Sequence, residues 1–298
     1  MKTESSLAEA IADFVVASFQ DGHVPAEVRR IAKRCIIDGV GVILAGSTEE
    51  CTRIVRDYAC SLEGKKEATL LGTNLRAPAP LAALVNGTAG HSMDWDDTVL
   101  PSTPDRAVLV HPTLAPLAAG LAIGEKLDAP GRELLTAFVA GVDVECKIAE
   151  AIHPDHWSRG FHTSNTMGVF GACTTAARML KLPPGQITHA IGIAASMASG
   201  LMANFGTMVK PLHAGRAAEC GIAAAELAAR GYVANPGVLE AKKGFFHAFA
   251  GGFDPEKVIG RLGNPFHIVS PGVCIKTYPC GVVGHPGMDG MKKLCVEH

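Results

Sequence analysis

The stretch PAEVRRIAKRCIIDGVGVILAG, residues 25–46, decides the fold class, because its apolar residues recur with helical spacing. Pro25 suits a first-turn position, where a missing N–H costs little, and Gly46 suits a helix end. The GVGVILAG end has a passing likeness to a nucleotide-binding loop. However, these glycines follow an amphipathic helix, whereas a nucleotide-binding loop follows a β-strand. We therefore interpret them as positions of close helix packing.

The same periodicity extends along most of the chain. A capping signal at Ser6 and Glu9 opens SLAEAIADFVVASF, whose apolar stripe comprises Leu7, Ile11, Phe14, Val15 and Phe19. Further helices are expected at about 78–93, 113–127, 131–152, 165–181, 186–202 and 212–230. Residues 67–78, EATLLGTNLRAP, form the best β-like segment, with a turn at 72–74. Without an alternating β–α rhythm or a fixed repeat, a parallel sheet and a solenoid are both disfavoured, and the pattern predicts a mainly α fold.

The tail differs in character from the rest of the chain. From residue 264, in NPFHIVSPGVCIKTYPCGVVGHPG, proline, glycine and β-branched residues replace the alanine-rich helical pattern. We therefore predict a helical domain over residues 1–265 and the beginning of another subdomain over 266–298.

Composition excludes several classes of function. Hydrophobic residues make up 48% and aromatic residues 5%, so alanine and glycine carry much of the apolar content, which suits closely packed helices. The net charge is −2 and there is no Lys/Arg run, so neither nucleic acid nor an anionic membrane is an expected partner. No apolar stretch is long enough for a membrane span. Nine cysteines without a CxxC indicate reduced thiols, and the N-terminus lacks a signal-peptide pattern, so we expect a soluble cytoplasmic protein.

GHSMDWDDT, residues 90–98, contains three aspartates, although only 19% of the residues in the chain are charged. If the preceding helix continues, His91, Asp94 and Thr98 share one face, while Asp96 and Asp97 point elsewhere and cap the next turn. A buried aspartate beside a histidine can act as acid or base, although a polar helix end held by local hydrogen bonds is equally consistent. An aspartate-rich Mg²⁺ site is a weaker alternative, because no second acidic cluster occurs.

Other histidines precede predicted helices. His111, in VHPT, and His162, ahead of a helix with Ser164 or Asn165 at its cap, could reach a cleft, although a surface histidine is the default interpretation. HPDH, residues 153–156, has zinc-like spacing but no third ligand nearby.

NFGTMVKPLHAGRAAECG, residues 204–221, is the most suggestive stretch. Lys210 lies at the cap of a helix that Pro211 begins, and His213 and Arg216 fall in its first two turns. Such a helix start is a good receptor for a carboxylate or phosphate. A solvated basic helix start is the alternative, but the apolar residues that follow favour a cleft. Motifs of the GxSxG, HExxH, Walker and DFG types are absent.

Five segments, taken in order, resemble the MmgE/PrpD family, which includes 2-methylcitrate dehydratase, cis-aconitate decarboxylase and iminodisuccinate epimerase. They are NGTAGHSMDWDDT (86–98), HPT (111–113), GFHTSNTMGVFGA (160–172), KPLHAGRAA (210–218) and KTYPC (276–280). The likeness spans essentially the whole chain. It implies a large all-helical domain followed by a smaller α+β lid, an active site between them and, usually, a homodimer.

The resemblance also implies roles for particular residues. Its catalytic positions match Asp94, His111, His162 and Lys210, and we expect Thr98, His213, Arg216 and Lys276 to bind substrate. Lys210, with His213 or Arg216, would hold substrate carboxylates, and Asp94 would orient a histidine or shuttle a proton. His111 and His162 are candidates for base and acid. The family's shared chemistry is proton transfer at a carbon next to a carboxylate, with no metal, nicotinamide or flavin, so we expect no cofactor.

Two departures concern the choice of reaction. Gly281 occupies the position where a decarboxylase-like pattern has a histidine, with His285 four residues further on, and the loop between Thr98 and His111 lacks a Trp-His run. Both argue against cis-aconitate decarboxylase. The family pattern also continues through the lid, so this sequence carries only the start of it. We therefore expect a dehydratase-type lyase acting on a small di- or tricarboxylate. The alternatives are an epimerase of the iminodisuccinate type and a lidless module that binds carboxylates or dimerises without turnover.

Overall fold

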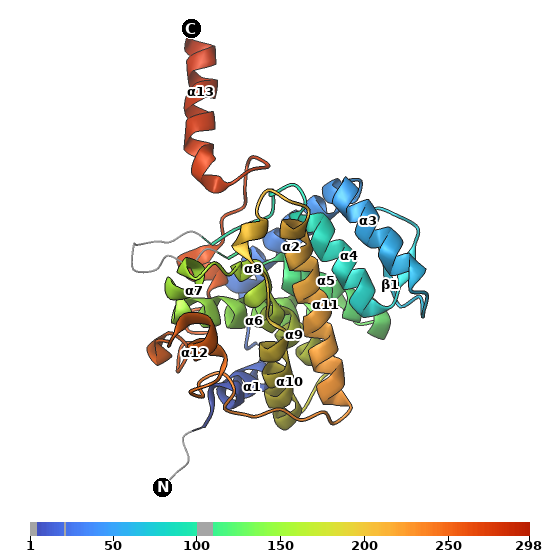
Figure 1. Cartoon of the computed structure of the whole chain (residues 1–298), viewed down its shortest axis with the longest axis vertical. Helices are drawn as coiled ribbons and strands as arrows, with labels where there is room; N and C mark the ends of the chain where they lie inside the picture. Colours follow the sequence, from blue (N-terminus) through green and yellow to red (C-terminus); the bar gives the residue numbers. More distant parts are fainter. Residues whose placement is uncertain (1–4, 21, 100–109) are drawn as a thin grey trace.

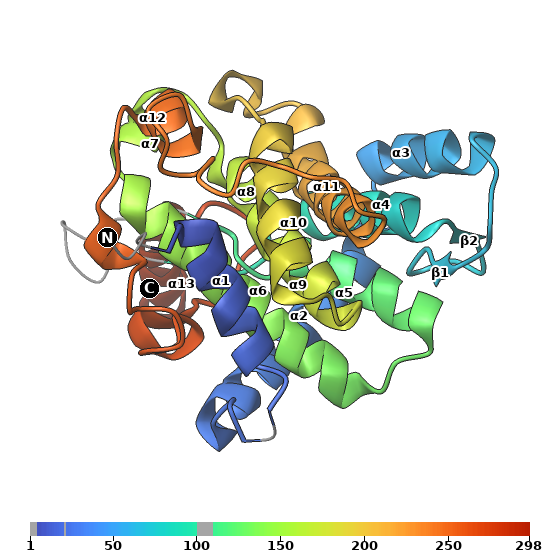
Figure 2. The same ribbon diagram turned by 90° about the horizontal axis from the view of Figure 1, so that it is seen from below.

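The computed structural model describes residues 5–20, 22–99 and 110–298, and in this part of the chain helices dominate (Figures 1 and 2). The helices are α1 (Leu7–Ala17), α2 (Ala26–Gly46), α3 (Glu50–Ser61), α4 (Ala79–His91), α5 (Leu114–Leu127), α6 (Gly131–Ile152), α7 (Asp155–Ser158), α8 (Thr163–Thr166), α9 (Gly168–Met179), α10 (Pro184–Met197), α11 (Val209–Ala229), α12 (Phe245–Ala250) and α13 (His285–Glu297). The predicted mainly α fold is confirmed.

Several local signals act as expected. Ser6 caps α1, because its side chain accepts from the backbone N–H of Glu9 while the Glu9 carboxylate accepts from that of Ser6. Pro25 is the N-cap of α2, which ends at Gly46. The β-like segment forms two short antiparallel strands, β1 (Ala68–Thr69) and β2 (Arg76–Ala77), with Ala68 opposite Ala77.

Other helix boundaries differ from those predicted. The helix predicted over 78–93 is α4, which ends at His91, and the one predicted over 165–181 begins at Thr163 and divides into α8 and α9 at Met167. The helix predicted over 186–202 is α10, which ends at Met197, because the following backbone is extended and Leu201 pairs with Phe161. The helix predicted over 212–230 is α11, which starts at Val209.

Helices α4, α5, α6, α9 and α11 form the middle of the bundle and bury most of their residues. Many of these buried residues are alanine or glycine, so the helix axes can approach closely. The predicted packing role is confirmed for Gly39 and Gly46 of α2, because a Cβ on Gly39 would meet the Leu117 side chain and one on Gly46 would lie 2.0 Å from the backbone oxygen of Ala89. It is wrong for Gly41, which has nothing within 4 Å.

The most extensive contact between two described helices joins α4 to α11, which lie side by side in Figure 1. A Cβ added to Gly87 would lie 2.7 Å from the Cα of Gly215, and one added to Gly215 would lie 2.1 Å from the backbone oxygen of Leu84. The two backbones therefore touch directly. His91 lies one turn beyond Gly87, and His213 lies just before Gly215, so this contact brings the end of α4 to the start of α11.

The tail begins on the bundle and then leaves it. Cys274 exchanges backbone hydrogen bonds with Thr98, and Lys276 is buried. By contrast, α13 has no buried residue and extends away from the bundle (Figure 1). The boundary at residue 265 stays a prediction.

Two further properties concern the described part of the chain. All nine cysteines lie in it, and all are free thiols. Its helices include none with the length and apolar character needed to cross a membrane.

The contact between α4 and α11 yields a test by substitution. Gly215→Ala should lower the free energy of unfolding by about 1–3 kcal/mol, because its methyl group would meet backbone atoms that cannot move independently. Gly41→Ala is the matched control, since a Cβ on this helical glycine meets nothing within 4 Å. It should raise stability by about 0.5–1 kcal/mol. Urea denaturation of both variants measures the difference, and equal effects would contradict the packing role.

Candidate active site

Five segments of the chain bring polar side chains together at the meeting point of α4 and α11. His91 ends α4, Asp94 and Asp96 follow it, and His111 precedes α5. His162 precedes α8, Lys210 and His213 lie in the first turns of α11, and Lys276 comes from the tail. Hydrogen bonds and ring contacts connect these residues, as described below.

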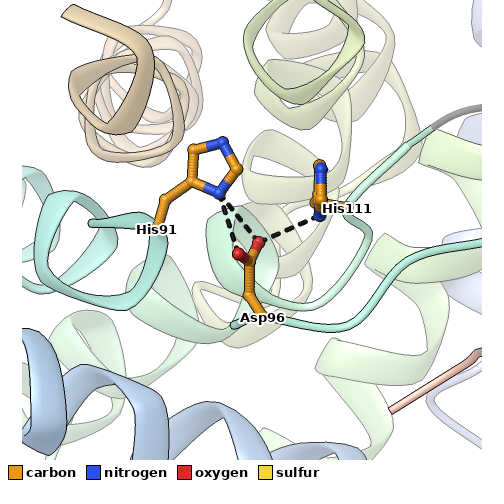
Figure 3. A group of neighbouring side chains, drawn as sticks. All are labelled: His91, Asp96 and His111. Carbon is orange, nitrogen blue, oxygen red and sulfur yellow. Dashed lines mark hydrogen bonds and ion pairs between the residues drawn. The ribbon is translucent and has the colours of Figure 1, made fainter. Parts of the chain in front are cut away.

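Asp96 is a buried carboxylate shared by two histidines (Figure 3). Nδ1 of His91 lies 2.9 Å from both of its oxygens, and Nδ1 of His111 lies 3.2 Å from Oδ2. Burial acts to raise the pKa of Asp96, but His91 and His111 outweigh it and hold this pKa well below its usual value. Asp96 is therefore an ionised acceptor.

These contacts fix the tautomers of both rings. Nδ1 of His111 also lies 2.8 Å from the backbone oxygen of Asp97, which can only accept, so this nitrogen carries the proton. Nδ1 of His91 must likewise donate to ionised Asp96. In its neutral form, each ring therefore has its lone pair on Nε2. Burial lowers the pKa of His91 to about 4 despite the opposing effect of Asp96, so this ring is neutral at neutral pH.

Four rings form a continuous group, the histidine row, which comprises His111, His91, His162 and His213. The centroid of the His91 ring lies 4.8 Å from that of the His111 ring and 5.7 Å from that of the His162 ring. Nδ1 of His162 lies 2.8 Å from Nδ1 of His213, so one donates while the other accepts. Burial and the neighbouring histidines hold the pKa of His162 far below its ordinary value, and burial with Lys210 lowers that of His213. Burial therefore favours the neutral form of both rings.

Asp94 is held by two lysines beside the histidine row. Nζ of Lys210 lies 3.0 Å and Nζ of Lys276 lies 2.8 Å from the same oxygen, Oδ1, and Lys276 also donates to the backbone oxygen of Asp94. Burial opposes ionisation of Asp94, but Lys276 and Lys210 lower its pKa. The two ammonium groups and the Asp94 carboxylate together carry one positive charge, and the ionised Asp96 of the same site carries one negative charge.

A cavity of about 390 Å³ opens at this point. Its lining includes His91, Ser92, Asp94 and Lys210, together with residues from the start of α3 and from the turn before α11. A volume of this size accommodates a small organic acid. Lys210 supplies a cation in the wall of this cavity.

The expected arrangement of GHSMDWDDT is wrong in one respect. His91, Asp94 and Thr98 do not share a helix face, because α4 ends at His91 and Asp94 adopts a left-handed conformation with φ 51°. The partner of His91 is Asp96, and Asp97 accepts from the side chain of Thr113 at the N-cap of α5.

Two of the residues expected to bind substrate have partners inside the protein. The Thr98 hydroxyl is buried and donates to the backbone oxygen of Val110 at 3.2 Å. Arg216 lies on the outer side of α11, where its side chain is 54% exposed and pairs with Glu219 at 2.6 Å. Arg216 is absent from the described lining of the cavity. By contrast, His213 and Lys276 belong to the group of polar side chains described above, since His213 contacts His162 and Lys276 contacts Asp94.

Further expectations near the site also need correction. Ser164 and Asn165 lie within α8, and no described side chain caps this helix. His156 of the HPDH segment is buried against Phe161 and Phe249, an apolar setting that does not suit a zinc ligand. Nε2 of His285 lies 3.3 Å from the backbone oxygen of Cys280, and its ring contacts Tyr278. His285 therefore has its described contacts within the tail.

The sequence patterns did not indicate Asp96 as a site residue. Its role depends on the turn after His91, and the spacing of five residues between the two is typical of neither a helix nor a strand. The only sequence signal for its role was the cluster of aspartates in which it lies.

The ligand atoms of His91, Asp96 and His111 lie within 4.8 Å of one another, a spacing that a metal ion could bridge. However, both Nδ1 atoms carry protons in this arrangement, so a metal would have to displace both and break the bond from His111 to Asp97. The three aspartates also diverge, to the lysines, to the histidines and to Thr113, which does not suit a Mg²⁺ cluster. Hydrogen bonding is the role that this geometry fits, and the absence of a cofactor stays a prediction.

The role of Asp96 can be tested by ¹⁵N NMR of the histidine rings. In Asp96→Ala, His91 loses the acceptor of its Nδ1–H and should shift to the Nε2–H tautomer, whereas His111 should keep Nδ1–H through the Asp97 carbonyl. Asp96→Asn is the matched control, because its amide oxygen still accepts from His91. An unchanged His91 tautomer in Asp96→Ala would contradict the assignment.

Comparison with known proteins identifies the family of this chain. The model of the MmgE/PrpD N-terminal domain matches residues 9–258. The chain is 34% identical to human cis-aconitate decarboxylase over 267 residues, covering 89% of this chain and 54% of that protein. It is 32% identical to the mouse enzyme of the same name, covering 88% and 54%, and 28% identical to that of Aspergillus terreus, covering 91% and 56%. The chain thus spans about half the length of these relatives. Since the match extends over most of its residues, the chain belongs to the MmgE/PrpD family, a family of lyase type.

Proposed function

We propose that this chain forms the helical part of a cofactor-independent lyase that acts on a small di- or tricarboxylate through proton transfer at a carbon next to a carboxylate. The observation that carries the proposal is the cavity lined by Lys210 and His91, with the His111 ring next to that of His91 and an Nδ1–H assigned on both rings. A cation and a neutral base side by side are what such chemistry requires.

The charges of the site match the demands of the reaction. Removing a proton next to a carboxylate places negative charge on the substrate, and a fixed cation stabilises that charge. Lys210 donates to Asp94 with one of its three N–H groups, which leaves donors for a substrate carboxylate. Lys276 holds Asp94 from the other side, so the Lys210 ammonium is positioned before substrate arrives.

His111 is the best candidate for the base. Its side chain is 17% exposed, whereas that of His91 is fully buried, so His111 is the more accessible ring of the two. Its Nδ1–H is committed to the Asp97 carbonyl and Asp96, which leaves the Nε2 lone pair as the acceptor of a proton. His162, with His213, is the candidate for the acid, a role in which its ring, held neutral by burial, would first have to take up a proton.

Dehydration is the leading reaction. The base takes a proton from the carbon next to a carboxylate, the electron pair forms a carbon–carbon double bond, and the adjacent hydroxyl leaves as water after the acid protonates it. Gly281 supports this choice, because a decarboxylase-like pattern has a histidine there. Decarboxylation of cis-aconitate is the second candidate, supported by the names of the relatives.

The two reactions can be separated by their products. The protein is incubated in turn with citrate, 2-methylcitrate, cis-aconitate and iminodisuccinate, and ¹H NMR follows the products. Water loss from a hydroxy acid supports the dehydratase, and release of carbon dioxide from cis-aconitate supports the decarboxylase instead. Inversion of iminodisuccinate would indicate the epimerase. Turnover of none of them by folded protein would favour a carboxylate-binding module.

Substitutions test the assigned roles on whichever substrate is turned over. His111→Ala should lower kcat by about 10²–10⁴-fold, because a general base contributes that much. Lys210→Ala should raise KM and lower kcat/KM, since substrate loses its cation. Lys33→Ala, on the exposed side of α2, removes one positive charge as a control and should leave both constants unchanged. Kinetics close to those of the parent in both site variants would contradict the assignment.

A further inference from the structure

A second cavity, of about 620 Å³, lies between the end of α1 and the starts of α2 and α6, and it also borders the end of α9. It shares no described lining residue with the candidate active site. Helix α1 borders this cavity and α3 borders the other, and Figures 1 and 2 show these two helices on different sides of the bundle.

The lining of this cavity is strongly cationic. Four of its lining residues are basic: Arg29, Arg132, Arg178 and Lys181. Glu133 is the sole carboxylate among the described lining residues, and Asp21 lies outside the described part of the chain. Lys181 pairs with Glu133 at 3.3 Å, which neutralises one charge of each sign. Three guanidinium groups from three different helices or loops therefore remain around one cavity.

Arg178 is the most informative of these groups, because it is only 7% exposed. Its Nε donates to the Ser18 hydroxyl at 3.2 Å, its Nη2 approaches the Ser18 backbone oxygen at 3.5 Å, and its guanidinium lies 4.1 Å from the centre of the Phe19 ring. All of these partners are neutral. Within the described ranges no carboxylate forms an ion pair with Arg178. The charge of Glu133, which pairs with Lys181, acts on Arg178 only without direct contact. Such burial is costly unless an anion completes it.

The other cations are more exposed and better placed to adapt to a ligand. Arg29 donates through Nη1 to the backbone oxygen of Val24, which holds its guanidinium near the cavity. Arg132 lies in the first turn of α6, whose N-cap Pro130 provides no side-chain cap, so the positive end of this long helix adds to the field. The positive charge is thus concentrated around the cavity and only partly neutralised.

We propose that this cavity binds a small molecule carrying a phosphate or pyrophosphate group. A phosphate presents several oxygens in a tetrahedral arrangement, so guanidinium groups from different directions can each donate to it, whereas a carboxylate offers two coplanar oxygens. The volume exceeds that of the anion alone, and it lies within the range of cavities that hold small organic molecules. The ligand therefore has a further part, for which Phe19 and Leu135 supply apolar surface.

Isothermal titration with pyrophosphate, without divalent cations, tests this site directly. The double variant Arg132→Gln/Lys181→Gln removes two exposed cations, so it should keep the fold while weakening binding about tenfold or more. Arg178→Lys keeps the charge but loses the planar fork, and it should also weaken binding. Arg53→Gln, which removes an exposed cation from α3, is the charge-matched control and should bind within about twofold of the parent.

Further arms separate this cavity from the candidate active site and phosphate from carboxylate. Lys210→Ala should leave pyrophosphate binding unchanged, and citrate should bind at the second cavity more weakly than pyrophosphate. The proposal is overturned if pyrophosphate does not bind, if the double variant binds as the parent does, or if Lys210→Ala abolishes binding. Citrate binding that equals that of pyrophosphate and is lost in the double variant would overturn the choice of phosphate. Because the probe and readout involve no turnover, these outcomes are independent of the proposed lyase activity.

Discussion

The direct backbone contact between Gly87 of α4 and Gly215 of α11 is the constraint on which the candidate site depends. Any larger side chain at either position would separate the two helices, since the added atom would lie within 3 Å of backbone. The ends of these helices carry His91 and His213, and Lys210 lies one turn before His213. Small residues in the core thus serve function as well as packing, because they set the distance between a histidine row and a cation.

Electrostatics then determines what these groups can do. One buried carboxylate, Asp96, orients two imidazoles, while burial keeps His91 and His162 neutral. Positive charge is supplied separately, by two lysines that converge on Asp94. Under the proposed function, a neutral base and a fixed cation would take separate roles, as carbanion-like chemistry next to a carboxylate requires. Belonging to a lyase-type family agrees with that division.

Much of the fold could be predicted from local patterns, because helix periodicity and the Ser6–Glu9 capping box act through near neighbours in the sequence. The sequence also singled out His111, His162 and Lys210, which the fold brings together. The turn at Asp94 could not be predicted, since its left-handed backbone is held by lysines 116 and 182 residues away. Local spacing therefore paired His91 with the wrong aspartate. It also gave no means of telling that Arg216 lies on the outer side of α11.

Solvent-deuterium incorporation is the most direct test of the central claim, that this site transfers protons at a carbon next to a carboxylate. The protein is incubated in D₂O with citrate, 2-methylcitrate, cis-aconitate or iminodisuccinate, without added metal, and NMR follows deuterium in substrate and product. We predict that deuterium appears at a carbon next to a carboxylate of at least one of them, even where net turnover is slow. Folded protein that exchanges no such hydrogen in any of the four would contradict the account.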